Sequence, residues 1–151
     1  MITGCSGIAI GTLDSRVNTQ TSAINVVNTA GRAGQIYNRS LRQALYVPGQ
    51  ATAQYDLTSS ISVSSTRTLS VSGVTSTFKK MTMITTFSLV NRADNEVLVN
   101  DTVTADATLG TVSSLFSQDQ SESHARDRMA KLLAQRVVQR LQLYFLKNLD
   151  G

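Results

Sequence analysis

Polar and apolar residues alternate along three segments in the middle of the chain. These segments are QYDLTSSISVSS (54–65), FKKMTMITTFSLV (78–90) and VLVNDTVTADA (97–107). In the first segment, alternate positions hold Tyr55, Leu57, Ser59, Ile61 and Val63. Because successive side chains of a strand point to opposite faces, each segment predicts a strand with one buried face.

The connections between these segments predict how the strands pair. The turn-forming cluster NRADNE (91–96) separates the last two segments and favours a tight antiparallel connection. The stretch TRTLSVSGVTST (66–77) is polar and only weakly alternating. Two interpretations of it remain open: the strand continues, or a long hairpin loop begins. Either way, we expect an antiparallel meander.

A strand and a helix are predicted before the meander. The short β-branched run AINVVN (23–28) is typical of a strand. After the turn-rich NTAGRAG, the segment QIYNRSLRQALY places its apolar residues on one side of a helix. These residues are Tyr37, Leu41, Ala44 and Leu45. Pro48 and Gly49 end this helix.

The end of the chain predicts a long amphipathic helix. Ser117 and Gln120 have the spacing of a capping box at its start. Its apolar stripe consists of Ala130, Leu133, Val137, Leu141 and Tyr144. The pattern extends over about seven turns. Three interpretations remain open: the helix overhangs its sheet, meets a partner, or simply packs along the sheet.

The predicted order is therefore β-α-β-β-β-α. This order favours an α+β fold, a two-layer sandwich in which a mixed sheet of about four strands carries both helices on one face. The other face would be rich in Ser and Thr, and would stay wet or meet a polar partner. Residues 6–22 show no sustained period, so we expect 1–22 to be a flexible leader and 23–151 a single domain.

The composition of the chain limits the classes of molecule that it could bind. The 151-residue chain has a net charge of +4, 41% hydrophobic residues and only 16% charged residues. A basic balance indicates either a mildly basic surface or an anionic partner. Nucleic acid is disfavoured, because the chain has no Trp and no interleaving of aromatic and basic residues. No apolar run approaches a membrane span, so we expect membrane contact only through an anchor.

Catalytic chemistry is not evident in the sequence. His124 is the only histidine, and a lone cysteine can form neither an internal disulfide nor a metal cluster. There is no nucleophile elbow, P-loop or paired carboxylate set. We therefore expect a protein that is not an enzyme, with no cofactor and no metal.

Three basic residues flank the connection between the second and third predicted strands. Arg67 precedes it, and Lys79 and Lys80 follow it, so antiparallel pairing brings all three to one end of the sheet. They are either scattered solvated charges or a cationic tip for phosphate or carboxylate groups.

The first residues raise a separate question. Ile2, Thr3, Gly4 and Cys5 have the pattern of a bacterial lipobox, whose cysteine is lipidated. A secretory signal needs about 7–15 apolar residues before its cleavage site. If Met1 is the native start, the pattern arises by chance and the protein is cytoplasmic; otherwise Cys5 is the mature N-terminus.

Taken in order, several segments resemble the LptE family of lipopolysaccharide-assembly lipoproteins, in its alphaproteobacterial form. The segments are GRAGQIYNRSLRQAL, YDLTSSISV, TTFSLVNRADNEVLVNDTVTADA and SSLFSQDQSESHARDRMAKLLAQRVVQRLQLYF. The resemblance covers about residues 23–146. It departs from the family at Ser6 and Gly7, where members commonly carry Gly and an aromatic residue after the cysteine.

This resemblance implies a lipid-anchored protein on the periplasmic side of the outer membrane. It implies that the domain plugs and helps assemble an LptD-type β-barrel and assists delivery of lipopolysaccharide to the outer leaflet. It implies lipidation of Cys5, and lipopolysaccharide contact through Arg67, Lys79 and Lys80. The alternatives are an auxiliary lipoprotein of an ABC-type lipid transporter, or a small hydrolase.

Overall fold

The computed structural model describes residues 16–46, 52–69, 77–110 and 114–150. After a helical segment at 16–22, six elements follow in sequence. They are β1 (Ile24–Val26), α2 (Gly31–Leu45), β2 (Tyr55–Leu69), β3 (Thr77–Asn91), β4 (Val97–Gly110) and α3 (Leu115–Asp150).

The strands form one mixed sheet of four strands in the order β1-β2-β3-β4. The short β1 is parallel to β2, and the other two pairs are antiparallel. In the register, Ile61 lies opposite Thr85, which lies opposite Val103. Residues 66–69 continue β2, as the first of the two interpretations has it for this part of the stretch, and residues 70–76 lie outside the described residues.

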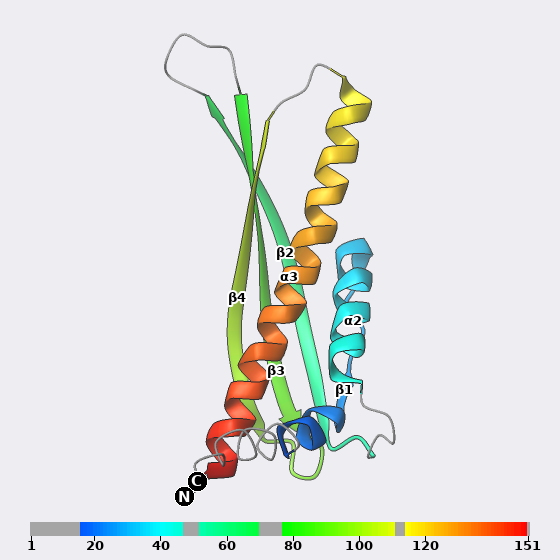
Figure 1. Ribbon diagram of the computed structural model, residues 1–151, viewed down its shortest axis with the longest axis vertical. Coiled ribbons are helices and arrows are strands. Elements are labelled where there is room, and N and C mark those ends of the chain that lie inside the picture. The colour runs from blue at the N-terminus through cyan, green and yellow to red at the C-terminus, as the bar shows by residue number, and fades with distance from the viewer. Residues whose placement is uncertain (1–15, 47–51, 70–76, 111–113, 151) are drawn as a thin grey trace, which may run out of the picture.

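Both helices pack on one face of this sheet, which confirms the predicted two-layer α+β fold (Figure 1). The core lies between the layers, because the alternating apolar positions of the strands meet the apolar stripes of the helices. Its fully buried side chains include Tyr37 and Leu41 of α2, Met81, Met83, Phe87 and Leu89 of β3, and Leu133, Val137 and Leu141 of α3.

The two helices differ in length and therefore in what they cover. The 36 residues of α3 span about 54 Å at a rise of 1.5 Å per residue and follow the whole sheet. The 15-residue α2 lies beside only the lower part of the sheet in Figure 1. We call the part of the sheet covered by both helices the proximal half, and the part covered by α3 alone the distal half.

The start of α3 differs from the predicted capping box. The helix begins at Leu115, and the Ser114 side-chain oxygen accepts a 3.5 Å hydrogen bond from the N–H of Ser117. The carbonyl of Ser114 accepts from the N–H of Gln118 at 3.0 Å. Ser114 therefore occupies the cap position, and the helix starts earlier than the apolar stripe indicates.

Residues 16–22, which we expected to be part of a flexible leader, are helical. Val17 is buried, and the Thr21 hydroxyl donates to the carbonyl of Asn18 at 3.2 Å. The Tyr55 hydroxyl donates to the side chain of Gln20 at 2.9 Å, which ties this segment to β2. Polar residues hide the helical period here. The rest of the predicted leader, Cys5 included, lies outside the described residues.

No helix in the described part of the chain is long and apolar enough to cross a membrane.

Candidate functional site

The face of the sheet opposite the helices carries mainly short hydroxyl side chains. Its positions are Thr58, Ser60, Ser62, Ser64 and Thr66 of β2, Thr82, Ile84, Thr86 and Ser88 of β3, and Asn100, Thr102, Thr104 and Thr108 of β4. We call this set the hydroxyl face. The hydroxyls of Thr86 and Thr102 lie 3.3 Å apart and form a hydrogen bond, and the Thr82 hydroxyl donates to the Asp106 carboxylate at 2.8 Å. This arrangement matches the Ser- and Thr-rich face predicted from the alternation.

Charged groups border the hydroxyl face at its two ends. At the proximal end, Asp56 accepts hydrogen bonds from Arg92 at 3.0 Å and from Asn25 at 2.9 Å. The bond from Arg92 is the main reason that the pKa of Asp56 lies below its usual range. At the distal end, Lys80 lies 4.0 Å from Asp106. A surface of uncharged side chains on β2, β3 and β4 separates these two pairs.

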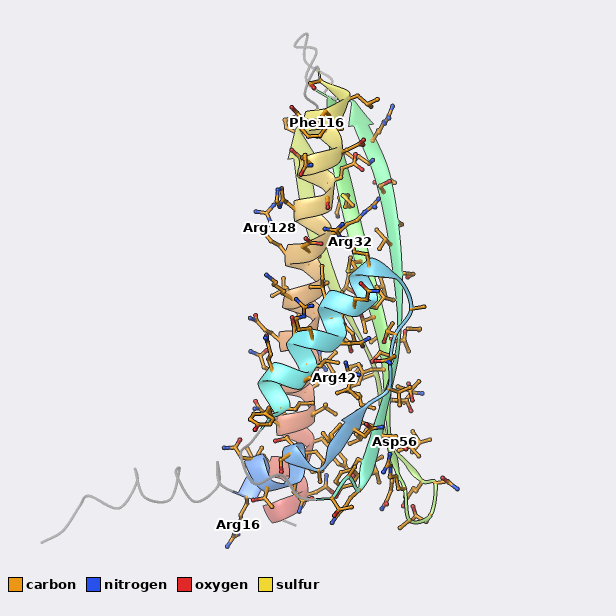
Figure 2. The ribbon with its side chains drawn as sticks, turned by 90° about the vertical axis from the view of Figure 1, so that its right-hand side faces the viewer. Arg16, Arg32, Arg42, Asp56, Phe116 and Arg128 are labelled. Carbon is orange, nitrogen blue, oxygen red and sulfur yellow. The ribbon has the colours of Figure 1, made fainter. Side chains whose placement is uncertain are left out.

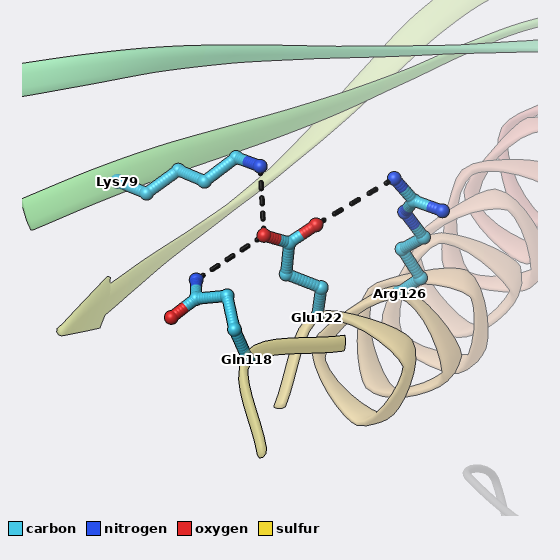
Figure 3. Close-up of polar contacts among 4 residues, drawn as sticks. All are labelled: Lys79, Gln118, Glu122 and Arg126. Carbon is cyan, nitrogen blue, oxygen red and sulfur yellow. Dashed lines mark hydrogen bonds and ion pairs between the residues drawn. The ribbon is translucent and has the colours of Figure 1, made fainter. Parts of the chain in front are cut away.

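Lys79, one of the three predicted lipopolysaccharide contacts, is held in an ion pair (Figure 3). Its ammonium donates to Glu122 of α3 at 2.7 Å, and the two side chains are only 17% and 15% exposed. Gln118 also donates to this carboxylate, at 3.2 Å. The hydrogen bond from Lys79 is the largest cause that lowers the pKa of Glu122. Lys79 therefore joins β3 to α3 in the distal half.

The other two predicted contacts lie at the same end of the sheet but on different faces. Arg67 is paired with Lys79 in the register, so it faces the helix side, where it is exposed. Lys80 is the next residue along β3 and points to the opposite face, near Asp106. The sequence correctly brings the three residues to one end, but Arg67 and Lys79 lie on the helix side of the sheet and Lys80 lies on the other side. The connection between them, residues 70–76, lies outside the described residues.

A notch that the sequence did not reveal opens where α2 begins. Its floor is formed by Ile61 and Val63 of β2, and it has a volume of about 400 Å³. The walls include Ala33 and Arg32 of α2, and Arg126 and Asp127 of α3. We call these six residues the β2 notch. Residues far apart in the sequence form it, so no local motif could have indicated it.

A larger, shallower groove of about 780 Å³ runs along the outer side of α2. The Arg42 guanidinium in it donates to the carbonyl of Val26 at 3.3 Å and to the side chain of Asn28 at 2.5 Å. Arg42 thereby fixes the connection between β1 and α2, which gives the groove a structural role. Arg42 is visible beside β1 in Figure 2.

The described residues contain no group of three or more His, Cys, Asp or Glu side chains that could hold a metal ion. His124 is exposed on α3, as predicted for a solvated helix residue.

Comparisons with known proteins agree with the fold. A family model described as LptE, lipopolysaccharide-assembly, matches residues 19–141. Among curated proteins, none matches the chain significantly. Similar solved structures include a protein from Caulobacter crescentus described as a candidate lipoprotein, with 17% identity and a TM-score of 0.68 over 87% of this chain and 96% of that one.

Two further structures share the fold. A minor lipoprotein from Acinetobacter baumannii is 19% identical, with a TM-score of 0.55 over 80% of this chain and 91% of that one. The rare lipoprotein B from Shewanella oneidensis is 10% identical, with a TM-score of 0.61 over 85% of this chain and 98% of that one. At these identities the likeness concerns the architecture alone.

Proposed function

The chain belongs to the LptE lipopolysaccharide-assembly family, and from this premise we propose that it is a lipid-anchored plug of an LptD-type outer-membrane β-barrel. In this role it helps the barrel to assemble and assists delivery of lipopolysaccharide to the outer leaflet. The role is one of binding and positioning, without catalysis.

The hydroxyl face is the observation that carries this proposal. The lumen of a large outer-membrane barrel is polar and wet. A sheet face of short hydroxyl groups can form many exchangeable hydrogen bonds with such a wall, without the desolvation cost of burying charges. Charged pairs are confined to its ends, at Asp56 with Arg92 and at Lys80 with Asp106.

Lipidation of Cys5 would supply the membrane anchor. The segment 16–22 docks on the start of β2 through Gln20, so a tether before it would leave from the proximal end of the domain. A cysteine carrying two or three acyl chains would hold the domain stably at a membrane.

Arg67 and Lys80 are the two predicted lipopolysaccharide contacts that remain exposed. We propose that they attract anionic groups at the distal end, while Lys79 acts mainly through Glu122. Reversing the charges of Arg67 and Lys80 should weaken lipopolysaccharide binding most at low salt, because exposed charges are screened at high ionic strength. Unchanged binding at low salt would contradict this part of the proposal.

Co-purification from outer membranes, combined with mass spectrometry of the N-terminus, tests the partner and the anchor together. We expect an LptD-type barrel to be recovered with a chain lipidated at Cys5. Recovery with an inner-membrane transporter and no barrel would favour the auxiliary-lipoprotein alternative instead.

A matched pair of variants tests the hydroxyl face itself. Ser62→Glu with Thr104→Glu places two charges on this face, whereas Gln135→Glu with Gln139→Glu places them on exposed positions of α3. Loss of barrel co-purification in the first variant only is the expected result. Equal retention in both would remove the hydroxyl face from the interface.

A further inference from the structure

The side of β2 that faces the helices changes from buried to exposed along the strand. Leu57 is completely buried, whereas Val63 is 41% exposed and Arg67 is also exposed. On the neighbouring β3, Met81 and Met83 stay fully buried over the same stretch. The distal part of α3 therefore covers β3 but leaves β2 open, and the apolar floor of the β2 notch lies at this opening.

The notch combines an apolar floor with cationic walls. Ile61, Val63 and Ala33 supply apolar surface, and two of the three charged side chains that line it, Arg32 and Arg126, are positive. Its volume of about 400 Å³ is in the range of small-molecule sites. An apolar surface bordered by guanidinium groups complements a molecule with a hydrocarbon part and an anionic part.

The two guanidinium groups are held only loosely by their acidic neighbours. The Nη2 atom of Arg32 lies 3.9 Å from the Oδ2 atom of Asp127, and the Nη2 atom of Arg126 lies 4.0 Å from the Oε2 atom of Glu122. Their side chains are 75% and 52% exposed, so these contacts contribute little to stability. Glu122 is engaged more closely by Lys79, at 2.7 Å. Both arginines can therefore turn toward an anion at little cost.

We propose that the β2 notch binds an anionic amphiphile, with an acyl chain on Ile61 and Val63 and a phosphate group held by Arg32 and Arg126. The identity of the natural ligand rests on the proposed function: lipopolysaccharide is an acylated and phosphorylated glycolipid, and so has both of the parts that the β2 notch would bind. The β2 notch adds a binding site separate from Arg67 and Lys80, on a different part of the domain.

Titration of the full chain with dodecyl phosphate, below its micelle concentration, tests the proposal by calorimetry. Inorganic phosphate and the neutral detergent dodecyl maltoside separate the anionic contribution from the apolar one. We expect dodecyl phosphate to bind at least about ten-fold more tightly than either, because only this probe uses both floor and walls.

Two variants locate the site, each with a matched control. Val63→Asp should weaken dodecyl phosphate binding about ten-fold or more, since it places a competing carboxylate on the floor. Its control is Val97→Asp, at a 54% exposed valine at the start of β4.

Arg32→Gln combined with Arg126→Gln should weaken binding of dodecyl phosphate by a similar factor. Its control is Arg128→Gln, on the side of α3 away from the sheet (Figure 2).

Several results would overturn the inference. One is equal weakening by Val63→Asp and Val97→Asp, and another is full competition by inorganic phosphate, which would indicate a simple anion site. If the chain co-purifies with a barrel but does not bind dodecyl phosphate, the notch proposal fails and the proposed function stands. If the notch binds the probe but no barrel is recovered, the proposed function fails instead.

Discussion

The proximal and distal halves of the domain use the same strands in different ways. In the proximal half, α2 and α3 together bury the inward side of the sheet, including Leu57 and Leu89, and the α2 residues Tyr37 and Leu41 that pack on it are also at 0% exposure. The Tyr37 hydroxyl forms a 2.8 Å hydrogen bond with Ser59 of β2, while burial raises the pKa of Tyr37 to about 12. This half has the features of a rigid core.

In the distal half, α3 is the only helix that covers the sheet, and an ion pair adds to the apolar contacts between them. The ion pair between Lys79 and Glu122 connects β3 to α3, and Val63 remains exposed on β2. The same alternating pattern thus builds a core where two helices cover it and leaves part of β2 exposed where only one does. We infer that, on the helix side of the sheet, the proximal half provides most of the stability, whereas the distal half leaves the opening at which binding is proposed. The hydroxyl face on the other side extends over both halves.

Truncation of buried side chains should reveal the largest difference between the halves. Leu41→Ala in the proximal half should lower the free energy of unfolding by about 3–5 kcal/mol. Met81→Ala, equally buried in the distal half, should cost about 2–3 kcal/mol, because a single covering helix can relax toward the cavity. Urea unfolding of both variants measures this. Equal losses would mean that the two halves are packed equally tightly.

Gly34 tests the tight packing of the proximal half. A Cβ atom at this position would lie 2.4 Å from the carbonyl oxygen of Thr29, which belongs to the backbone and cannot rotate away. Gly34→Ala should therefore cost about 1–3 kcal/mol, although Gly→Ala in an open helix position is usually stabilising. Gln35→Ala, at the exposed neighbouring position, is the control and should have almost no effect in thermal unfolding.

Glu122→Gln tests the polar contact of the distal half. Loss of the charge-assisted bond to Lys79 should reduce stability by about 1–2 kcal/mol at neutral pH. The pKa of Glu122 lies below its ordinary 4.5 in the folded state, so its contribution is present above pH 4.5 and disappears as the pH falls through the folded pKa.

The difference between wild type and Glu122→Gln should therefore shrink as the pH falls below about 4.5. Denaturant titrations at several pH values measure it. A difference that stays constant down to strongly acidic pH would show that the carboxylate charge is not what stabilises this contact.

Thr85 lies at the boundary between the halves and should give the smallest effect. It is fully buried, and its hydroxyl has no hydrogen-bond partner among the described residues. Thr85→Val replaces this hydroxyl with a methyl group of similar size, and should raise stability by about 1 kcal/mol. Thr86→Val, on the hydroxyl face, should change it by less than about 0.5 kcal/mol. A loss of stability in Thr85→Val would indicate that a buried water satisfies the hydroxyl.

Much of the fold could be predicted because its signals are local. Alternation identified the long strands, and the stripe through Leu133, Val137 and Leu141 identified α3. The helix at 16–22 was missed because Thr21 occupies a position on its buried side where an apolar residue would have revealed the period. The earlier start of α3 was missed because its first residues, Leu115 and Phe116, are exposed and do not belong to the apolar stripe that identified the helix.

The candidate site was less predictable, for a physical reason. Antiparallel pairing alone brings Arg67, Lys79 and Lys80 to one end of the sheet. To predict that Lys79 is paired while Lys80 points to the other face, one must know which face of β3 meets α3. One must also know that the Glu122 carboxylate lies on that face. Glu122, 43 residues after Lys79 in the chain, has no local pattern that links it to this lysine.

Periods of two and 3.6 residues along the chain were enough to identify the four strands, α2 and α3, their order, and the apolar side of each long strand, but they did not identify the helix at 16–22. The position of α2 against β2, in contrast, could be seen only in the folded domain. That single placement leaves Val63 uncovered and puts Arg32 and Arg126 in the walls of one opening, the β2 notch. It depends on packing between segments distant in sequence, which no local period records.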